Sequence, residues 1–166
     1  MYLLKNKLDI FSRFKEFKGE AQKQSGKSLK VPKSDRGGEY KYNHFKAFCQ
    51  EKGIIIQNTT RYIAQQNGVA ERKNQSIMNM AGCMLHEKKL SNNYWANGVS
   101  TSMYILNKSP TIALQYIVPQ EAWNGNKVNV SHFRIFGSIA FSHVLEKLRK
   151  KLDDRSGKCI FVGYSE

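Results

Sequence analysis

Two acidic residues, each set in a short polar motif, are the side chains of this sequence best suited to chemistry. Asp35 lies in residues 34–40 (SDRGGEY), and Glu71 lies thirty-six positions later, in residues 65–74 (QQNGVAERKN). Carboxylates are the hard oxygen ligands that Mg²⁺ accepts, and paired divalent metals can activate an oxygen nucleophile while stabilising the leaving oxygen of a phosphodiester. The pair therefore indicates metal-dependent phosphodiester chemistry.

The spacing of the two acids is weak evidence by itself, because a chain with 13 Asp and Glu residues contains many such pairs on its surface. The surrounding residues carry more weight. Gly37 and Gly38 follow Asp35 closely, a Gln-Gln-Asn-Gly stretch precedes Glu71, and Arg72 comes directly after it. We interpret the two motifs as one catalytic constellation, with ordinary surface acids as the alternative.

Two short extended segments are predicted to support this constellation. Residues 29–33 form a short extended run that leads to Asp35. Pro32 within this run cannot donate a backbone hydrogen bond to a sheet. Residues 54–56 (III) are interpreted as a buried strand. Together with the helices between them, these segments favour an α/β fold with a parallel sheet core.

Helices are predicted on both sides of the second strand. Residues 43–52 show a helical apolar pattern that Gly53 closes, and a long helix begins near Val69 after the polar residues 58–68. Glu71 would then lie in the first turn of that helix. The positive end of the helix dipole would favour both this carboxylate and an approaching phosphate.

The remaining elements are predicted from the same periodicity. Residues 2–4 suggest the end of a strand, and Asp9 is a candidate cap for a helix whose apolar stripe runs to Ala21 and which stops near Gly26. A further helix is expected over residues 94–106.

After residue 126 the pattern changes to short apolar runs, at residues 133–135, 139–141 and 160–164, which predict a β-rich region. The basic stretch 146–158 between two of these runs is either a solvated hairpin loop or a nucleic-acid contact.

The charge of the chain points to a polyanionic partner. Lys and Arg number 27 against 13 Asp and Glu, which gives a formal net charge of +14, and nucleic acid is the expected partner of such a field. A merely soluble basic surface is the alternative. No segment has the length of a membrane span or the pattern of a signal peptide, so we expect an intracellular, non-secreted protein.

The cysteines predict no metal site. Cys49, Cys83 and Cys159 are odd in number and far apart, so reduced, buried thiols are expected.

The motifs resemble the integrase catalytic core of copia-type long-terminal-repeat retrotransposons, especially those of plants. The resemblance is carried by residues 2–7, 14–18, 34–40, 67–74, 104–107, 151–154 and 158–166. It implies an RNase H-like core over residues 1–126 that lacks its first strands, followed over 127–166 by part of a small Src-homology-3-like β-barrel. It also implies a polynucleotidyl transferase with two Mg²⁺ or Mn²⁺ ions, which trims the 3′ ends of element DNA and joins them to target DNA.

Carried over by position, Asp35 would be the second catalytic Asp and Glu71 the catalytic Glu, both metal ligands. The first Asp of the family falls before the Tyr2 position. DNA contacts would come from polar and basic side chains around the two motifs, namely Lys33, Arg36, Arg61, Gln66, Asn67, Arg72 and Lys73. Arg36, Arg61 and Ile63-Ala64 depart from the family pattern, where Asn, Pro and Thr-Pro are usual.

Three functions follow from these observations. The first is DNA integration in the nucleus as the family function, with these residues inactive alone because one metal ligand is missing. The second is a non-catalytic nucleic-acid binder. The third is an oligomerising remnant that pairs with itself or with an intact integrase. None of the three uses a small-molecule substrate or a membrane.

Overall fold

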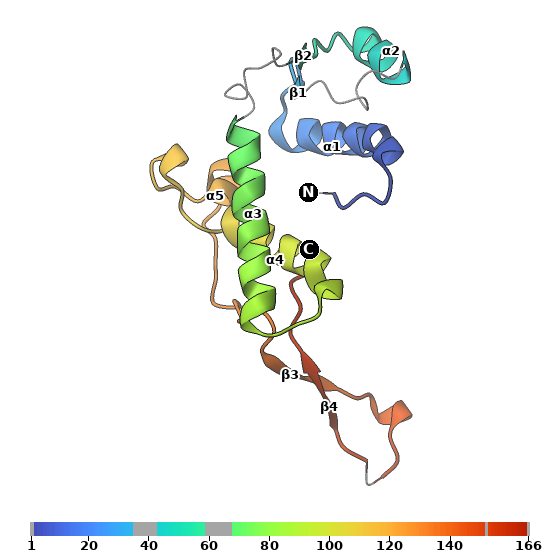
Figure 1. The fold of residues 1–166 in the computed structure, drawn as a ribbon, viewed down its shortest axis with the longest axis vertical. Coiled ribbons are helices and arrows are strands. Elements are labelled where there is room, and N and C mark those ends of the chain that lie inside the picture. Colours follow the sequence, from blue (N-terminus) through green and yellow to red (C-terminus); the bar gives the residue numbers. More distant parts are fainter. Residues whose placement is uncertain (1, 35–42, 59–67, 152, 166) are drawn as a thin grey trace. The chain divides into compact units, whose positions relative to one another are not determined.

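The structure is a computed structural model of the 166-residue chain, and it describes residues 2–34, 43–58, 68–151 and 153–165. The chain forms two compact units, Met1–Asn74 and Gln75–Glu166, and the boundary falls within one long helix. In chain order the elements are η1 (Lys7–Asp9), α1 (Ile10–Ser25), β1 (Lys33–Ser34), α2 (Asn43–Glu51), β2 (Gln57–Asn58), α3 (Gly68–Glu87), η4 (Asn92–Tyr94), α4 (Trp95–Asn107), η5 (Ile112–Leu114), α5 (Pro119–Asn124), β3 (Ile139–His143), η6 (Glu146–Leu148) and β4 (Ser156–Ile160) (Figure 1). None of the described helices is both long and apolar enough to cross a membrane.

The first unit is built around an aromatic cluster between α1, α2 and the approach to β2. Phe45, Cys49 and Ile54 are its buried members, and Phe11 and Phe14 of α1 meet the Phe45 ring at centroid distances of 5.7 and 4.9 Å. Phe11 and Phe14 of the apolar stripe predicted for α1 thus pack against the core, whereas Leu8 and Phe17 of the same stripe are exposed. The predicted end of α1 is confirmed, because Gly26 closes the helix at φ +65° and donates its N–H to the Gln22 carbonyl.

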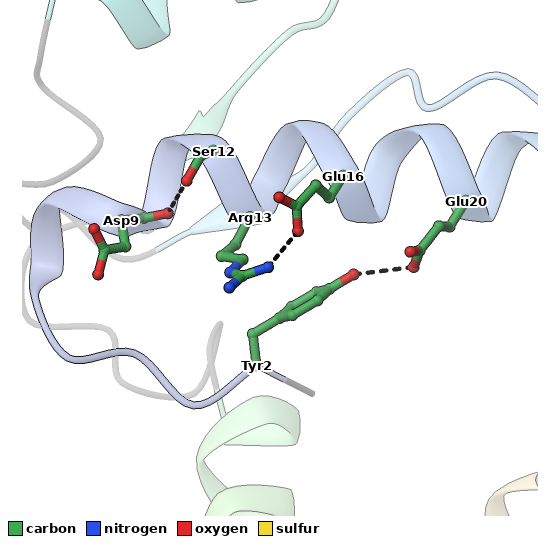
Figure 2. Close-up of polar contacts among 6 residues, drawn as sticks. All are labelled: Tyr2, Asp9, Ser12, Arg13, Glu16 and Glu20. Carbon is green, nitrogen blue, oxygen red and sulfur yellow. Dashed lines mark hydrogen bonds and ion pairs between the residues drawn. The ribbon is translucent and has the colours of Figure 1, made fainter. Parts of the chain in front are cut away.

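The segment before α1 differs from the prediction. Residues 2–4 form no strand. The Tyr2 hydroxyl instead donates to the Glu20 carboxylate at 3.0 Å, and the Arg13 guanidinium, paired with Glu16 at 2.6 Å, lies 5.6 Å from the centre of the Tyr2 ring (Figure 2). The hydrogen bond to Glu20 raises the pKa of Tyr2. The chain before α1 is therefore tied to the helix by side chains.

Asp9 does not cap α1 with its side chain. Its carboxylate accepts the backbone N–H of Asn6 at 3.3 Å, so it closes the short η1 turn, while its backbone carbonyl accepts the Ser12 hydroxyl at 2.9 Å (Figure 2). Asp9 thus stabilises the turn that leads into α1, which corrects the predicted cap.

β1 and β2 are parallel, with Lys33 opposite Gln57 and Ser34 opposite Asn58. The strand predicted over residues 54–56 is displaced, since β2 begins at Gln57, and Ile55 is 69% exposed instead of buried. Pairing nevertheless starts earlier than the strand bounds, because the Gln57 N–H donates to the Pro32 carbonyl at 3.0 Å. Pro32 contributes an acceptor there, so its missing N–H does not interrupt this pair. The parallel pairing is confirmed, but within the described residues the parallel sheet consists of two strands of two residues each.

The second unit is built on α3 and α4, both close to their predicted bounds. Ile77 and Ala81 of α3 pack with Val99 of α4 in a buried cluster. The helices approach closely at Gly98, where an added Cβ would lie 3.4 Å from the Ala81 Cβ. A small residue at each side of this contact allows that approach.

β3 and β4 form an antiparallel hairpin in which Ile139 faces Ile160 and His143 faces Ser156. Residues 133–135, predicted as a strand, form none. The backbone N–H of Arg134 donates to the Tyr164 hydroxyl at 2.8 Å, and the Phe133 ring contacts the Tyr104 ring at 6.0 Å. Side-chain contacts therefore take the place of a sheet ladder in this segment.

Candidate catalytic and nucleic-acid-binding site

The two parallel strands of the first unit end at one edge of their pair. Because they run in the same direction, their carboxyl ends, Ser34 and Asn58, lie side by side. Asp35 follows Ser34 directly in the sequence. The carboxyl ends of parallel strands are where α/β proteins place their ligand sites.

Several predicted site residues lie outside the described residues. These are Asp35, Arg36, Arg61, Gln66 and Asn67. The convergence of Asp35 with Glu71 therefore stays a prediction. Lys33, Glu71, Arg72 and Lys73 are described, and the site is built from these four.

Glu71 occupies the position predicted for it. Helix α3 begins at Gly68, so Glu71 lies in its first turn, and its side chain is exposed. The first backbone N–H groups of a helix have no intrahelical acceptor and give this end a partial positive charge. The exposed Glu71 carboxylate is accessible to a metal ion at this end of the helix.

Two basic side chains, Arg72 and Lys73, lie in the first turns of α3. An added Cβ on the buried Gly68 would lie 3.0 Å from Nη1 of Arg72, so the guanidinium lies against the first residue of the helix. Lys73 is exposed on the next position, and Lys33 is exposed on β1. Lys33 and Lys73 are therefore open to solvent. The Arg72 guanidinium lies at the helix start, where phosphate contacts are favoured.

Among the described residues, no group of three or more His, Cys, Asp and Glu side chains could hold a metal ion. The Glu71 carboxylate is an oxygen donor of the kind that Mg²⁺ and Mn²⁺ accept. Its exposure leaves room for the waters that Mg²⁺ retains. The donor chemistry thus fits a hard divalent cation, and Glu71 alone would supply one ligand.

The cysteines agree only partly with expectation. Cys49 is buried, and burial raises the pKa of its thiol. Cys83 and Cys159 are exposed free thiols, which corrects the prediction that all three are buried. Cys83 lies on the solvent side of α3, and the hairpin that carries Cys159 is largely exposed.

Comparison with known proteins places these observations in a family. Residues 138–166 match the model of the retroviral polymerase SH3-like domain. The whole chain is 39% identical to the retrovirus-related Pol polyprotein from transposon TNT 1-94 of Nicotiana tabacum, over 166 residues. It is 28% identical over 165 residues to that from transposon RE2 of Arabidopsis thaliana. This chain belongs to the retrovirus-related Pol polyproteins of plant transposons.

The family resemblance seen in the motifs is therefore confirmed. The chain spans only 12% and 11% of the lengths of these two Pol polyproteins. A structural neighbour supports the fold. A chain in the structure of the simian T-cell lymphotropic virus intasome in complex with PP2A regulatory subunit B56 gamma superposes with a TM-score of 0.55 at 13% identity, covering 95% of this chain and 54% of that one.

The match at residues 138–166 coincides with the hairpin and the segment after it. It agrees with the Src-homology-3-like region expected there. The domain boundary at residues 126/127 and the RNase H-like assignment of the first domain stay predictions.

Sequence reasoning missed a ring cluster in the second unit. Tyr104 stacks on Tyr164 with ring centroids 4.3 Å apart and planes inclined by 17°, and its hydroxyl lies 2.8 Å from Nε2 of His132. Both tyrosines belong to motifs that carry the family resemblance, but sixty residues separate them. The aromatic content of the two motifs was the available signal, and nothing in their spacing predicts a contact.

Proposed function

We propose that this chain acts in DNA integration, as part of the integrase region of a copia-type retrotransposon Pol polyprotein. The observation that carries the proposal is the similarity of the whole chain to Pol polyproteins of plant transposons, 39% over 166 residues for the tobacco relative. Integration takes place where chromosomal DNA is, so the nucleus is the proposed compartment. The structural neighbour from a retroviral intasome supports the same function at the level of fold.

The proposed catalytic groups are Asp35 and Glu71, each a ligand of Mg²⁺ or Mn²⁺. When bound, the metal pair would polarise a phosphodiester and activate the attacking oxygen. Glu71 is suited to this role because it is exposed in the first turn of α3, beside the cations at the helix start. Asp35 is suited to it because it directly follows a strand of a parallel pair.

The proposed partner is DNA, with further integrase copies as protein partners. The formal charge of +14 supplies a field that attracts phosphate. Direct contacts are proposed for Lys33, Arg36, Arg61, Gln66, Asn67, Arg72 and Lys73. Most of these can neutralise or hydrogen-bond a phosphate oxygen, so they would set affinity and position more than sequence preference.

These 166 residues on their own are expected to bind DNA without joining it. The family resemblance puts a third acidic ligand before the Tyr2 position, and two carboxylates give an incomplete metal clamp. A non-catalytic nucleic-acid binder is therefore the second candidate. The charge of the chain favours it independently of the acidic motifs.

The test is duplex DNA binding by the wild-type chain and the Glu71→Gln variant, with and without Mg²⁺, across a salt series. Wild-type affinity should fall as salt rises, with a log–log slope of about −0.9 per phosphate contacted. Mg²⁺ should tighten binding by the wild-type chain and not by Glu71→Gln. Glu87→Gln removes the same charge from the other end of α3 and should respond to Mg²⁺ like the wild type.

A parallel nicking and strand-transfer assay separates the two candidates. Joining by the wild-type chain that Glu71→Gln abolishes would show that these residues hold a complete site. Salt-sensitive binding with an equal Mg²⁺ response in both variants would leave a DNA binder in which Glu71 is no ligand. Absence of DNA binding at low salt would contradict both candidates.

A further inference from the structure

The segment that follows β4 continues the hairpin toward helix α4. Phe161 still pairs with the chain before β3, since its N–H donates to the Ser138 carbonyl at 2.9 Å and its carbonyl accepts the Gly137 N–H at 2.7 Å. Beyond Phe161, Gly163 lies close to Thr101 of α4 and the Tyr164 ring stacks on Tyr104 of the same helix. The hairpin and α4 are thus joined through residues 161–164, which we call the strap.

Gly163 brings the backbone of the strap close to α4. Its φ is +141°, and an added Cβ would lie 2.8 Å from Oγ1 of Thr101. Thr101 is 1% exposed, and its hydroxyl finds no hydrogen-bond partner among the described residues. Both the backbone conformation and the lack of space require glycine here. The strap therefore lies directly on the helix, with no room for a side chain between them.

Tyr164 fixes the strap at a second point. Its ring stacks on Tyr104 of α4 at 4.3 Å, its hydroxyl accepts the Arg134 N–H at 2.8 Å, and the same hydroxyl donates to the Arg134 carbonyl at 3.2 Å. Tyr104 is itself held, because its hydroxyl lies 2.8 Å from Nε2 of His132 and the Lys108 ammonium lies 4.6 Å from its ring centre. One side chain thus links α4, the segment before β3 and the strap.

The hairpin has little core of its own. Ile139 and Phe141 are 62% and 68% exposed, and a two-stranded hairpin alone is marginally stable in water. Its connecting residues carry the basic side chains Lys147, Lys150, Lys151 and Arg155. The contacts that hold this basic loop in place must therefore lie at the opposite end of the hairpin, where the strap follows β4.

We propose that the strap docks the β3–β4 hairpin on α4, and that Gly163 and Tyr164 are positioning residues that orient its basic loop for DNA. The orientation for DNA rests on the proposed function, whereas the docking does not. The docking has two independent contacts, a backbone approach at Gly163 and a ring stack at Tyr164. Each can be removed separately.

The first test measures amide hydrogen exchange of β3 and β4 in the full chain with Gly163→Ala. The Cβ collides with Thr101, so exchange in the hairpin should rise by about tenfold or more, while amides of the α3–α4 cluster keep their protection. Gly125→Ala is the matched control. It has φ +72° but nothing within 4 Å of an added Cβ, so it introduces backbone strain without a collision, and hairpin exchange should not change.

A rescue variant shows whether the collision is the cause. Thr101→Ala removes the oxygen that Gly163→Ala would strike, so the double variant should recover part of the protection that Gly163→Ala loses. Recovery would establish contact between the strap and α4. Unchanged hairpin exchange in Gly163→Ala would overturn the docking. Equal exchange in the single and double variants would overturn the collision with Thr101 as the cause and assign the loss to the backbone strain at φ +141°.

The second test addresses Tyr164. Tyr164→Ala removes the ring stack and both hydroxyl contacts, whereas Tyr164→Phe keeps the stack, so hairpin exchange should increase in the order wild type, Tyr164→Phe, Tyr164→Ala. Loss of a stacked aromatic pair corresponds to roughly a two- to tenfold change. Tyr116→Ala removes an equally large ring that is 73% exposed and should leave the hairpin unchanged. Equal effects of Tyr116→Ala and Tyr164→Ala would contradict the role of Tyr164.

DNA binding by the same variants separates this inference from the proposed function. With docking confirmed by exchange, Tyr164→Ala should weaken DNA binding and flatten its salt slope, and Tyr164→Phe should restore most of both. Unchanged DNA binding with a mobile hairpin would overturn the positioning role and leave the docking standing. If the wild-type chain binds no DNA, the proposed function fails, while the exchange result still decides whether the strap exists.

Discussion

The two units of this chain are stabilised by different kinds of core. In the first, the Phe11 and Phe48 rings meet edge-to-face, with centroids 5.6 Å apart, around the buried Phe45 and Cys49. In the second, the core between α3 and α4 combines aliphatic side chains such as Ile77 and Val99 with a close approach of two small residues, Gly98 and Ala81. Large rings fill space between elements that stand apart, whereas small residues let two helix backbones approach.

This difference corresponds to what each unit carries. The first unit has short strands, β1 and β2, of two residues each, and the candidate site lies where they end. The second contains most of the 20-residue helix α3 and the whole of the 13-residue helix α4, on which the hairpin is placed. The chemistry is thus expected beside the aromatic core, while the close-packed helices serve as the support for the basic hairpin.

The largest expected effect is the loss of a ring from the aromatic core. Phe45 is 2% exposed and contacts two rings of α1, so Phe45→Ala should lower the free energy of unfolding by about 3–5 kcal/mol. Urea titration followed by circular dichroism measures this change. Phe17→Ala on α1 removes a ring that is 52% exposed and should cost well under half as much. Similar costs for both variants would show that this cluster is not the core of the unit.

A smaller effect is expected from filling the helix contact of the second unit. Gly98→Leu forces a side chain into the space before Ala81 and should destabilise by about 1–3 kcal/mol. Gly82→Leu on α3 meets nothing within 4 Å and replaces a poor helix former, so it should stabilise by up to about 1 kcal/mol. Tryptophan fluorescence reports the unfolding of this unit, because both tryptophans of the chain, Trp95 and Trp123, belong to it. If both leucine variants change stability in the same direction, the close approach at Gly98 does not distinguish the core of the second unit.

The sequence predicted local features of both units and missed the contacts between distant segments. The stripe of α1, its end at Gly26 and the position of Glu71 in α3 follow from periodicity and capping, which act within a few residues. The strand expected at residues 54–56 lies instead at Gln57–Asn58. Three consecutive isoleucines are compatible with a buried strand and equally with a half-exposed segment that precedes a strand. The Tyr104–Tyr164 stack was not predictable, since it depends on tertiary packing across sixty residues.

The candidate site shows the same division. The place of Glu71 on its helix is confirmed because a helix start is a local property. The convergence of Asp35 with Glu71 depends on how two separated segments fold, and Asp35 lies outside the described residues. Family motifs identified both residues, but only the local part of that prediction is tested by the structure.

The smallest expected effect is a dependence of the first core on alkaline pH. Burial raises the pKa of the Cys49 thiol, so the folded state retains this proton at a pH where the unfolded chain has lost it. The stabilisation is therefore fully present below the ordinary thiol pKa of about 8.5 and is lost as pH rises through the higher value of the folded protein.

Cys49→Ala should flatten this part of the pH profile while lowering stability at neutral pH, because it leaves a small cavity beside Phe45. Cys83→Ala, at an exposed thiol of α3, should leave the profile as in the wild type. Urea midpoints at pH 7 and at about pH 9.5, above the unfolded thiol's pKa, measure the difference. The same decline in the wild type and in Cys49→Ala would assign the alkaline loss to groups other than the Cys49 thiol.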